Sequence, residues 1–288
     1  MKQLVVLSGK GGTGKTTLTA SLAALLQDAV VVDCDVDAPD LHLLLKPTVL
    51  KVKDFYGSKL ASIDKDKCIK CGACIRSCRF DAIDDDFNVD QFSCEGCGVC
   101  GLVCPANAVS FTQRKAGEIY VSETKYGPMV HALLFPGEEN SGKLVTMTRL
   151  FANLTAQDRK KSLIIIDGSP GIGCPVISSI TNVDYALVIT EPTVSGIHDF
   201  ERLMQLVNHF SVKPLVVINK YDINEEKTHR IENYCNENDI TVLGKIPFDP
   251  IVVEAMVQGV PVVEYNVVTP ATIAIKDIFQ KVTKILEV

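Results

Sequence analysis

The 288-residue sequence has no tryptophan, few aromatic residues (6%), no run rich in Lys or Arg, and no long apolar stretch. A membrane-spanning helix needs about 18 consecutive apolar residues, so we expect no membrane span. The net charge of −6 and the lack of a basic run lead us to expect no binding of nucleic acid. The first residues lack the layout of a secretion signal, so we expect a cytoplasmic protein.

Short, wholly apolar runs separated by helical patterns dominate most of the chain. Hydrophobic residues make up 47% of the sequence, and its length allows one large domain and a small one. The apolar runs lie at 163–166, 186–189 and 215–218, and residues 30–34 are typical of a further buried strand. Such runs indicate parallel strands that are covered on both faces by helices. We therefore predict an α/β fold with a doubly wound, mainly parallel sheet.

The pattern changes between residues 62 and 113. Cysteines, aspartates and short turns replace the apolar strands there, and strand-like alternation resumes after residue 113. We interpret residues 62–113 as a small α+β domain inserted into a larger domain. The larger domain would then consist of residues 1–61 and 114–288.

A phosphate-binding motif follows a short β-rich run at residues 3–8. Residues 9–17 fit G-x-x-x-x-G-K-[ST], in which glycines let backbone N–H groups converge on phosphate oxygens. The following helix N-terminus adds partial positive charge, Lys15 neutralises the β and γ oxygens, and Thr16 can hold Mg²⁺. We predict binding of ATP with Mg²⁺ by Gly9, Lys10, Gly11, Gly12, Thr13, Gly14, Lys15, Thr16 and Thr17.

Lys10 is an addition to the general motif. With it, the loop resembles the deviant Walker A motif of the MinD, ParA and nitrogenase iron-protein superfamily. The resemblance implies a P-loop ATPase that forms a homodimer across the nucleotide. In such a dimer, Lys10 would reach the nucleotide of the partner subunit.

Acidic residues at two further strand ends extend the resemblance. Asp33 and Asp35 stand at the switch I position, where the superfamily places acids near Mg²⁺ and the attacking water; either could instead be a solvated strand end. Asp167 follows a Walker B-like strand. We take Asp35 and Asp167, with Thr16, as the Mg²⁺ ligands. The residues implied in catalysis are Lys10, Lys15, Asp35 and Asp167.

The base-binding side of the superfamily also has a counterpart. Asn219 ends the strand at 215–218 in a position that resembles the adenine-contacting strand end, so the resemblance implies that Asn219 reads the base. Residues 247–249 resemble a second loop on that side.

Cysteine is abundant in a sequence without an export signal. There are eleven cysteines, and eight of them form two copies of C-x2-C-x2-C-x3-C, at 68–78 and 94–104. Disulfides do not explain so regular a spacing, and zinc sites usually use two separated pairs of ligands. The repeat resembles a bacterial two-cluster ferredoxin, in which the fourth cysteine of each motif binds the other cluster. It implies two 4Fe–4S clusters, with the ligand sets Cys68, Cys71, Cys74, Cys104 and Cys78, Cys94, Cys97, Cys100.

One cysteine outside the repeat has two interpretations. Cys174 follows Asp167 by seven residues, where the nitrogenase iron protein has a ligand of a cluster between its subunits. We find no counterpart of the second ligand in the sequence, which favours a structural or redox-sensitive thiol.

Two classes of function fit these features. In the first, ATP binding and hydrolysis across a dimer is coupled to electron transfer through the clusters to an unknown redox partner. In the second, the chain is an ATP-dependent cluster assembly or carrier protein that serves an unknown acceptor. Permanent ligation by eight cysteines favours the first class. A nucleotide-sensing redox switch with little turnover is a third interpretation.

Overall fold

The computed structural model describes residues 1–138 and 141–287, and the chain divides into two compact units. The first unit consists of Met1–Lys53, Ile119–Leu133 and Ser141–Val288, and the second of Asp54–Glu118 and Leu134–Asn140. The predicted insert at 62–113 falls within the second unit. Its boundaries at 61/62 and 113/114 stay predictions.

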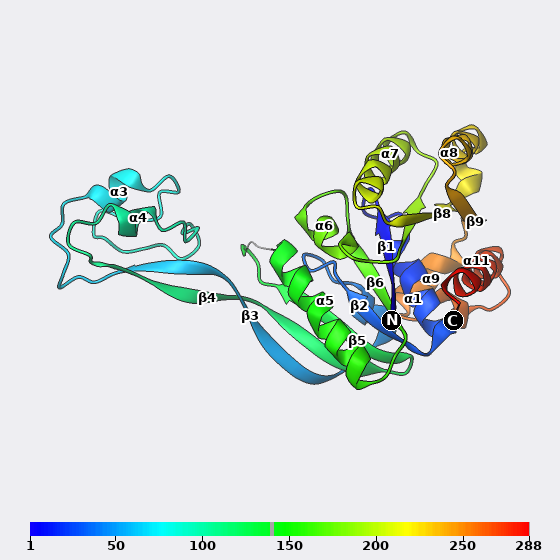
Figure 1. The fold of residues 1–288 in the computed structure, drawn as a ribbon, viewed down its shortest axis with the longest axis horizontal. Helices are drawn as coiled ribbons and strands as arrows, with labels where there is room; N and C mark the ends of the chain where they lie inside the picture. Colours follow the sequence, from blue (N-terminus) through cyan, green and yellow to red (C-terminus); the bar gives the residue numbers. More distant parts are fainter. Residues whose placement is uncertain (139–140, 288) are drawn as a thin grey trace. The chain divides into compact units, whose positions relative to one another are not determined.

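Among the described residues, nine strands form one sheet in the order β3-β4-β5-β2-β6-β1-β7-β8-β9 (Figure 1). From β5 to β9 in this order, each strand pairs with the next in parallel. A two-residue turn joins β4 to β5, which only an antiparallel pair allows. The mainly parallel α/β sheet is therefore confirmed. The strands are β1 (Lys2–Ser8), β2 (Ala29–Asp33), β3 (Thr48–Ile63), β4 (Val109–Thr124), β5 (Gly127–Leu134), β6 (Leu163–Pro170), β7 (Tyr185–Thr190), β8 (Lys213–Asn219) and β9 (Thr241–Ile246).

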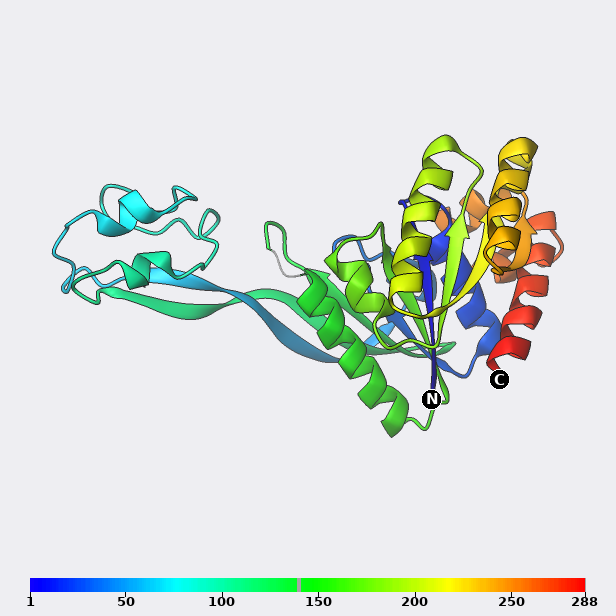
Figure 2. The ribbon, with the colours of Figure 1, turned by 45° about the horizontal axis from the view of Figure 1, so that its top comes forward.

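Helices cover both faces of the parallel part of the sheet. Helices α1, α10 and α11 pack on one face, and Figures 1 and 2 show α5, α6 and α7 on the side opposite α1. None of the described helices is long and apolar enough to cross a membrane. The helices are α1 (Lys15–Leu26), α2 (Leu41–Leu45), α3 (Ala73–Ser77), α4 (Val99–Leu102), α5 (Ser141–Asp158), α6 (Cys174–Ile180), α7 (Val194–His209), the 3-10 helix η1 (Tyr221–Ile223), α8 (Glu225–Glu237), α9 (Ile251–Val257), α10 (Val262–Tyr265) and α11 (Pro270–Leu286).

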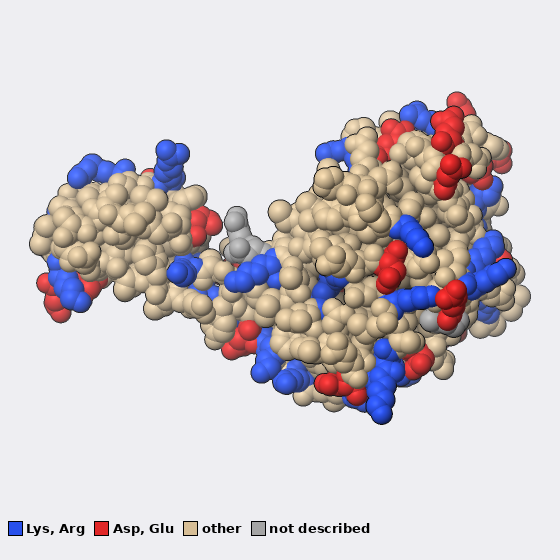
Figure 3. All heavy atoms as spheres, viewed as in Figure 1, with Lys and Arg blue, Asp and Glu red and all other residues tan. Residues whose placement is uncertain are grey.

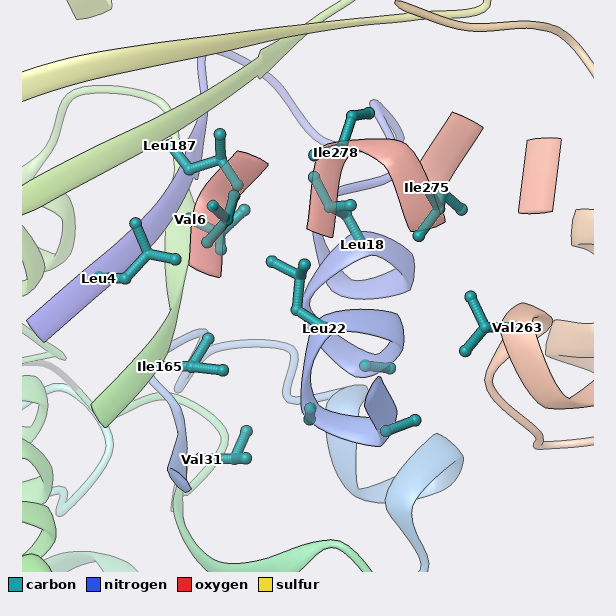
Figure 4. Packing of buried hydrophobic residues seen from close by; sticks show 14 of the residues in the cluster. Leu4, Val6, Leu18, Leu22, Val31, Ile165, Leu187, Val263, Ile275 and Ile278 are labelled. Carbon is teal, nitrogen blue, oxygen red and sulfur yellow. The ribbon is translucent and has the colours of Figure 1, made fainter. Parts of the chain in front are cut away.

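The hydrophobic core follows from the two-residue period of the strands. Leu4 and Val6 of β1 point to the same face, where Leu18 and Leu22 of α1 meet them (Figure 4). Helix α11 closes this layer with an apolar stripe that includes Ile275. The result is a rigid sheet whose carboxyl ends hold the loops described below.

Strands β3 and β4 are each 16 residues long and differ from the sequence-based expectation. The sequence predicts strand-like alternation only after residue 113 in this part of the chain, and it predicts no strand at residues 48–61. The first part of β3 does not show an apolar face turned to a core, because Val49, Leu50 and Val52 are all exposed. Its strand state depends on pairing with a neighbouring strand rather than on burial.

The second unit has its own small core around the cysteine repeat. Ile63, Cys74, Ile83 and Phe87 are buried together, and an isolated antiparallel bridge joins Ile83 to Val89. The helices α3 and α4 each begin within one of the two cysteine motifs. The unit is thus built around the repeat, from short elements and the paired ends of two strands.

Charged side chains are interspersed on the surface. Figure 3 shows acidic and basic residues close to one another on one face of the molecule, with no continuous basic area among the side chains described there. This agrees with the net charge of −6.

Candidate nucleotide and cluster sites

The phosphate loop connects the end of β1 to the start of α1. Gly12 and Gly14 have φ angles of 78° and 93°, in the left-handed region that favours glycine. A Cβ atom at Gly14 would also lie 2.5 Å from Nδ2 of Asn219. The loop thus turns sharply and leaves its backbone open in front of the N-terminus of α1, where the helix dipole favours anions.

Asp167 gathers the polar side chains of the first turn of α1. Its Oδ1 atom lies 3.0 Å from Nζ of Lys15, and its Oδ2 atom accepts a hydrogen bond from Oγ1 of Thr16 at 2.8 Å. Thr19 donates a further bond to Oδ1 at 2.9 Å. Lys15 and Asp167 are both buried. The predicted phosphate ligand, the predicted Mg²⁺ ligand and the Walker B-like acid are therefore in direct contact.

The charge of Lys15 is maintained despite its burial. Burial lowers the pKa of Lys15, but the nearby carboxylates of Asp167, Asp33 and Asp35 outweigh this and raise it. The lysine therefore remains protonated at neutral pH and stands ready to neutralise phosphate.

Asp33 and Asp35 have different environments. Asp33 is fully buried, and its two carboxylate oxygens accept hydrogen bonds from the backbone N–H groups of Asp35 and Leu41. Burial and the neighbouring Asp167 raise the pKa of Asp33 well above its ordinary value. Asp33 thus holds the backbone at both ends of the 35–41 loop by hydrogen bonds, and it is not a solvated strand end.

Asp35 faces a large groove beside the phosphate loop. It lies 3.8 Å from Nζ of Lys15, and burial raises its pKa to about 6, although Lys15 opposes the shift. Asp37 lines the same groove. Asp35 is thus a partly accessible carboxylate within reach of the predicted metal position.

Lys10 forms an ion pair and two hydrogen bonds with residues of its own chain. Its Nζ atom lies 2.7 Å from Oε1 of Glu191 and donates hydrogen bonds to the hydroxyls of Thr193 and Ser195 at 3.3 and 3.1 Å. Lys220 binds the other carboxylate oxygen of Glu191 at 3.1 Å. Burial raises the pKa of Glu191, but the hydrogen bonds from the two lysines outweigh this and lower it.

Glu191 was missed in the sequence. It lies two residues after the apolar run at 186–189 and directly after β7, so its position at the carboxyl end of a parallel strand was the signal that could have identified it. Its pairing with Lys10 depends on sheet order, because β7 lies next to β1.

The groove has apolar lining residues, which we call its apolar wall. The groove encloses about 940 Å³, and the wall consists of Leu43, Val252, Val253 and Met256, the last of which lies with its Sδ atom 3.5 Å from Oγ1 of Thr17. Asn219 also lines it, and its Nδ2 atom donates to the carbonyl of Thr13 at 2.7 Å. A polar end for phosphates and an apolar end for a base are thus present in one cavity.

The loop at 247–249 supports this wall through the backbone. Phe248 N–H donates to Asp222, and Oδ1 of Asp249 accepts from the N–H of Ile251 at the start of α9. The loop thereby fixes α9, which carries the apolar side chains of the groove.

The eight repeat cysteines line two separate cavities of the second unit. One cavity is lined by Cys68, Cys71, Cys74 and Cys104, and the other by Cys78, Cys94, Cys97 and Cys100. These are the two ligand sets implied by the sequence, including the exchange of the fourth cysteine. We call them site A and site B.

The walls of both sites suit a sulfur-ligated group. Ile63, Phe87 and Val109 line site A, and Val89 and Phe111 line site B. At site B, a Cβ atom at Gly96 would lie 2.1 Å from the carbonyl oxygen of Lys59, so only glycine lets this loop approach β3. Four thiols around an apolar cavity are a donor set that fits a 4Fe–4S cluster.

The thiols are spaced differently from the ligands of a single ion. Among the described residues, no group of three or more His, Cys, Asp or Glu side chains is arranged to hold one metal ion. A cubane cluster binds its four thiolates through four different iron atoms, so its ligands stand around the cluster rather than converge on a point.

The remaining cysteines have separate environments. Cys34 and Cys235 are buried, and burial raises the pKa of Cys235 to about 11. Cys174 is exposed at the start of α6. Its role as a structural or redox-sensitive thiol stays a prediction.

Comparison with known proteins identifies the relatives of this chain. A family model described as the CobQ/CobB/MinD/ParA nucleotide binding domain matches residues 4–262. An uncharacterised protein of Methanocaldococcus jannaschii is 35% identical over 287 residues, which cover 99% of this chain and 97% of that protein. The pyruvate synthase subunit PorD of Methanothermobacter marburgensis is 42% identical over 53 residues, 18% of this chain and 65% of that subunit.

Solved structures show the same fold. The septum site-determining protein MinD of Pyrococcus horikoshii, complexed with Mg-ADP, superposes with a TM-score of 0.62. It is 19% identical in sequence, and the match covers 99% of this chain and 97% of that one.

Proposed function

The chain belongs to the CobQ/CobB/MinD/ParA nucleotide-binding domain family, and from this premise we propose that it is an iron–sulfur ATPase. In this proposal, ATP binding and hydrolysis across a homodimer is coupled to electron transfer through two 4Fe–4S clusters. The observation that carries the proposal is the division of the eight repeat cysteines into two apolar cavities of four thiols each.

The nucleotide half of the proposal assigns each polar group a task. The backbone of the phosphate loop and Lys15 bind the phosphates of ATP. Thr16, Asp35 and Asp167 would hold Mg²⁺, which neutralises charge on the transferring phosphoryl group when bound. Lys15 then exchanges its contact with Asp167 for one with phosphate. Asn219 and the apolar wall of the groove receive the base.

Dimer formation would redirect Lys10. In the single chain, Glu191 holds Lys10 beside the phosphate loop. Across a homodimer, Lys10 would leave this carboxylate and bind the nucleotide of the partner subunit. Lys10 keeps a negatively charged acceptor in this exchange, because a phosphate oxygen replaces a carboxylate oxygen.

The cluster half of the proposal rests on the cysteines themselves. Cys68, Cys71, Cys74 and Cys104 would hold one cluster, and Cys78, Cys94, Cys97 and Cys100 the other. Each cluster would supply reversible one-electron chemistry. Cys104 and Cys78 each join the set of the opposite motif, so the two motifs lock together.

A carrier function is the second candidate. Cys71 and Cys97 are exposed, and an exposed ligand favours exchange of a cluster with an acceptor protein. The interlocked ligand sets favour retention instead, which is why we place electron transfer first.

The first experiment tests the clusters. Protein purified anaerobically should contain about eight iron and eight sulfide per chain, the sum of two cubane clusters. The variant Lys15→Ala is the matched control, because it should keep this iron while losing nucleotide binding. Iron near zero after anaerobic reconstitution would refute the proposal.

The second experiment tests the coupling. A nucleotide shifts a cluster potential only through different affinities for the oxidised and reduced protein, and the effect is reciprocal. A typical coupling of about 1–3 kcal/mol corresponds to roughly 40–130 mV for a one-electron couple. Potentiometry with and without a non-hydrolysable ATP analogue should detect this shift. Fixed potentials, together with ATP-dependent release of cluster to an apo-acceptor, would favour the carrier function.

A further inference from the structure

The two cysteine motifs share their spacing but differ in charge. Residues 68–78 contain Lys70 and Arg76 and no acid, a formal charge of +2 from two cations. Residues 94–104 contain Glu95 and no Lys or Arg, a formal charge of −1. A geometry that repeats while its charge reverses points to two sites with different properties.

The structure places Arg76 against site A. Its Nη1 atom donates a hydrogen bond to the carbonyl oxygen of Cys71 at 3.2 Å. A Cβ atom at Gly72 would lie 2.7 Å from the same nitrogen, so glycine provides the room for the guanidinium. Arg76 is exposed, but this hydrogen bond ties its guanidinium to the loop that carries the ligand Cys71.

A backbone N–H group also points at a sulfur of site A. Ala108 N–H donates to Sγ of Cys104 at 3.3 Å. Hydrogen bonds to ligand sulfurs and nearby positive charge stabilise the reduced, more negative cluster and so raise its potential.

Site B has a carboxylate where site A has a cation. Glu95 lies between two ligands and lines the cavity of site B, whose other walls are largely apolar. Glu95 is exposed, but a negative charge beside the ligands disfavours the extra electron of a reduced cluster. Arg79, which follows Cys78 of site B, is exposed like Arg76, but among the described residues no hydrogen bond ties its side chain to a ligand loop.

We propose that the two sites have unequal reduction potentials, and that site A takes up the first electron. The inference rests on the proposed function in that both sites must hold 4Fe–4S clusters. An external one-electron donor, such as dithionite, gives one electron to the site A cluster, which passes from the 2+ to the 1+ state. No proton or bond is exchanged. Arg76 and Glu95 set the order in which the two sites fill.

The test is a redox titration of the anaerobic full-length protein, followed by electron paramagnetic resonance. The wild type should show two separated midpoints. Arg76→Gln should lower only the higher midpoint, and Arg76→Lys should restore it. Glu95→Gln should raise only the lower midpoint. A shift of 59 mV would correspond to a tenfold change in the ratio of reduced to oxidised cluster at a fixed potential.

Lys115→Gln provides the matched control for loss of a charge. Lys115 lies four residues along β4 from Phe111 of site B and six from Val109 of site A. At about 3.3 Å per residue, both separations exceed the Debye length of about 10 Å, so neither midpoint should move.

The outcomes separate this inference from the proposed function. Protein without iron would refute both. Protein with about eight iron but a single shared midpoint would refute the inference alone. The inference alone would also be refuted if Arg76→Gln moved the lower midpoint, or if Glu95→Gln moved the higher midpoint.

Discussion

Replacing Lys15 should weaken the fold as well as nucleotide binding. In the nucleotide-free chain, Lys15 is the cation that lies 3.0 Å from buried Asp167 and 3.8 Å from Asp35. Lys15→Met would leave these carboxylates and Asp33 without it. Truncating one partner of a buried ion pair typically costs about 3–5 kcal/mol. Thr16 and Thr19 would still donate to Asp167, so we expect the lower end, about 3 kcal/mol.

The loss should depend on pH. Without Lys15, the carboxylates repel one another and their pKa values rise, so they bind protons more readily at low pH. The destabilisation should therefore be smaller at pH 5 than at pH 7.

Urea unfolding in the presence of EDTA, without nucleotide, measures this free energy. Circular dichroism at 222 nm reports mainly the first unit, because α3 and α4, the described helices of the second unit, have only five and four residues. Lys245→Met is the control: it removes the partner of Glu232 in a much more exposed pair, where we expect less than about 1 kcal/mol. If Lys15→Met cost no more than this control at pH 7, the inferred role of the buried pair would be wrong.

Four further predictions concern the nucleotide site. Lys10→Ala should leave ADP binding intact but suppress ATP-dependent dimerisation and phosphate release; a monomeric variant with the wild-type rate would contradict the cross-dimer role. Glu191→Gln removes the charged acceptor that holds Lys10 within its own chain, an interaction worth about 1.5–3 kcal/mol. Lys10 is then released more easily for the partner subunit, so sedimentation with ATP should show dimers at roughly tenfold lower protein concentration. The pKa of about 6 for Asp35 predicts that kcat/KM for ATP falls as pH drops through 6, and Asp35→Asn should remove this limb. By linkage, the raised pKa also makes unfolding easier as pH rises from about 4 to 6. Gly14→Ala should abolish binding of a fluorescent ADP analogue, because its Cβ would meet Asn219; unchanged affinity would refute the steric reasoning.

The parallel sheet was predictable because the middle parts of its central strands are buried on both faces. Runs such as residues 163–166 have no polar side that would blur the pattern, and β6, β7 and β8 appear where such runs stand. The long strands β3 and β4 were not predictable in the same way. Their exposed parts bury few side chains, and hydrogen bonds to a neighbouring strand leave no signature in one sequence.

The nucleotide site likewise has features that could be predicted from the sequence and features that could not. The phosphate loop is local, so its motif fixed the elements on either side of it. Which of Asp33 and Asp35 faces the groove depends on the course of the loop after β2. The partnership of Lys10 and Glu191 depends on strand order, and 181 residues of chain separate the two. Such contacts arise from the fold and not from a motif.

Two of the boundaries between the units fall inside β3 and β4, and this has a consequence for protein engineering. The chain crosses between the units within these strands, at Lys53–Asp54 and at Glu118–Ile119, and it crosses again on either side of Leu134–Asn140. Asp64 N–H donates to the carbonyl of Ala108, and regular antiparallel pairing counted back from there puts Asp54 opposite Glu118. The larger segment of the second unit, Asp54–Glu118, is therefore a single insertion whose two ends are paired with one another in β3 and β4. Excising residues 54–118 and joining the cut ends with an Asn-Gly turn should give a minimal ATPase that retains the other strands of the sheet.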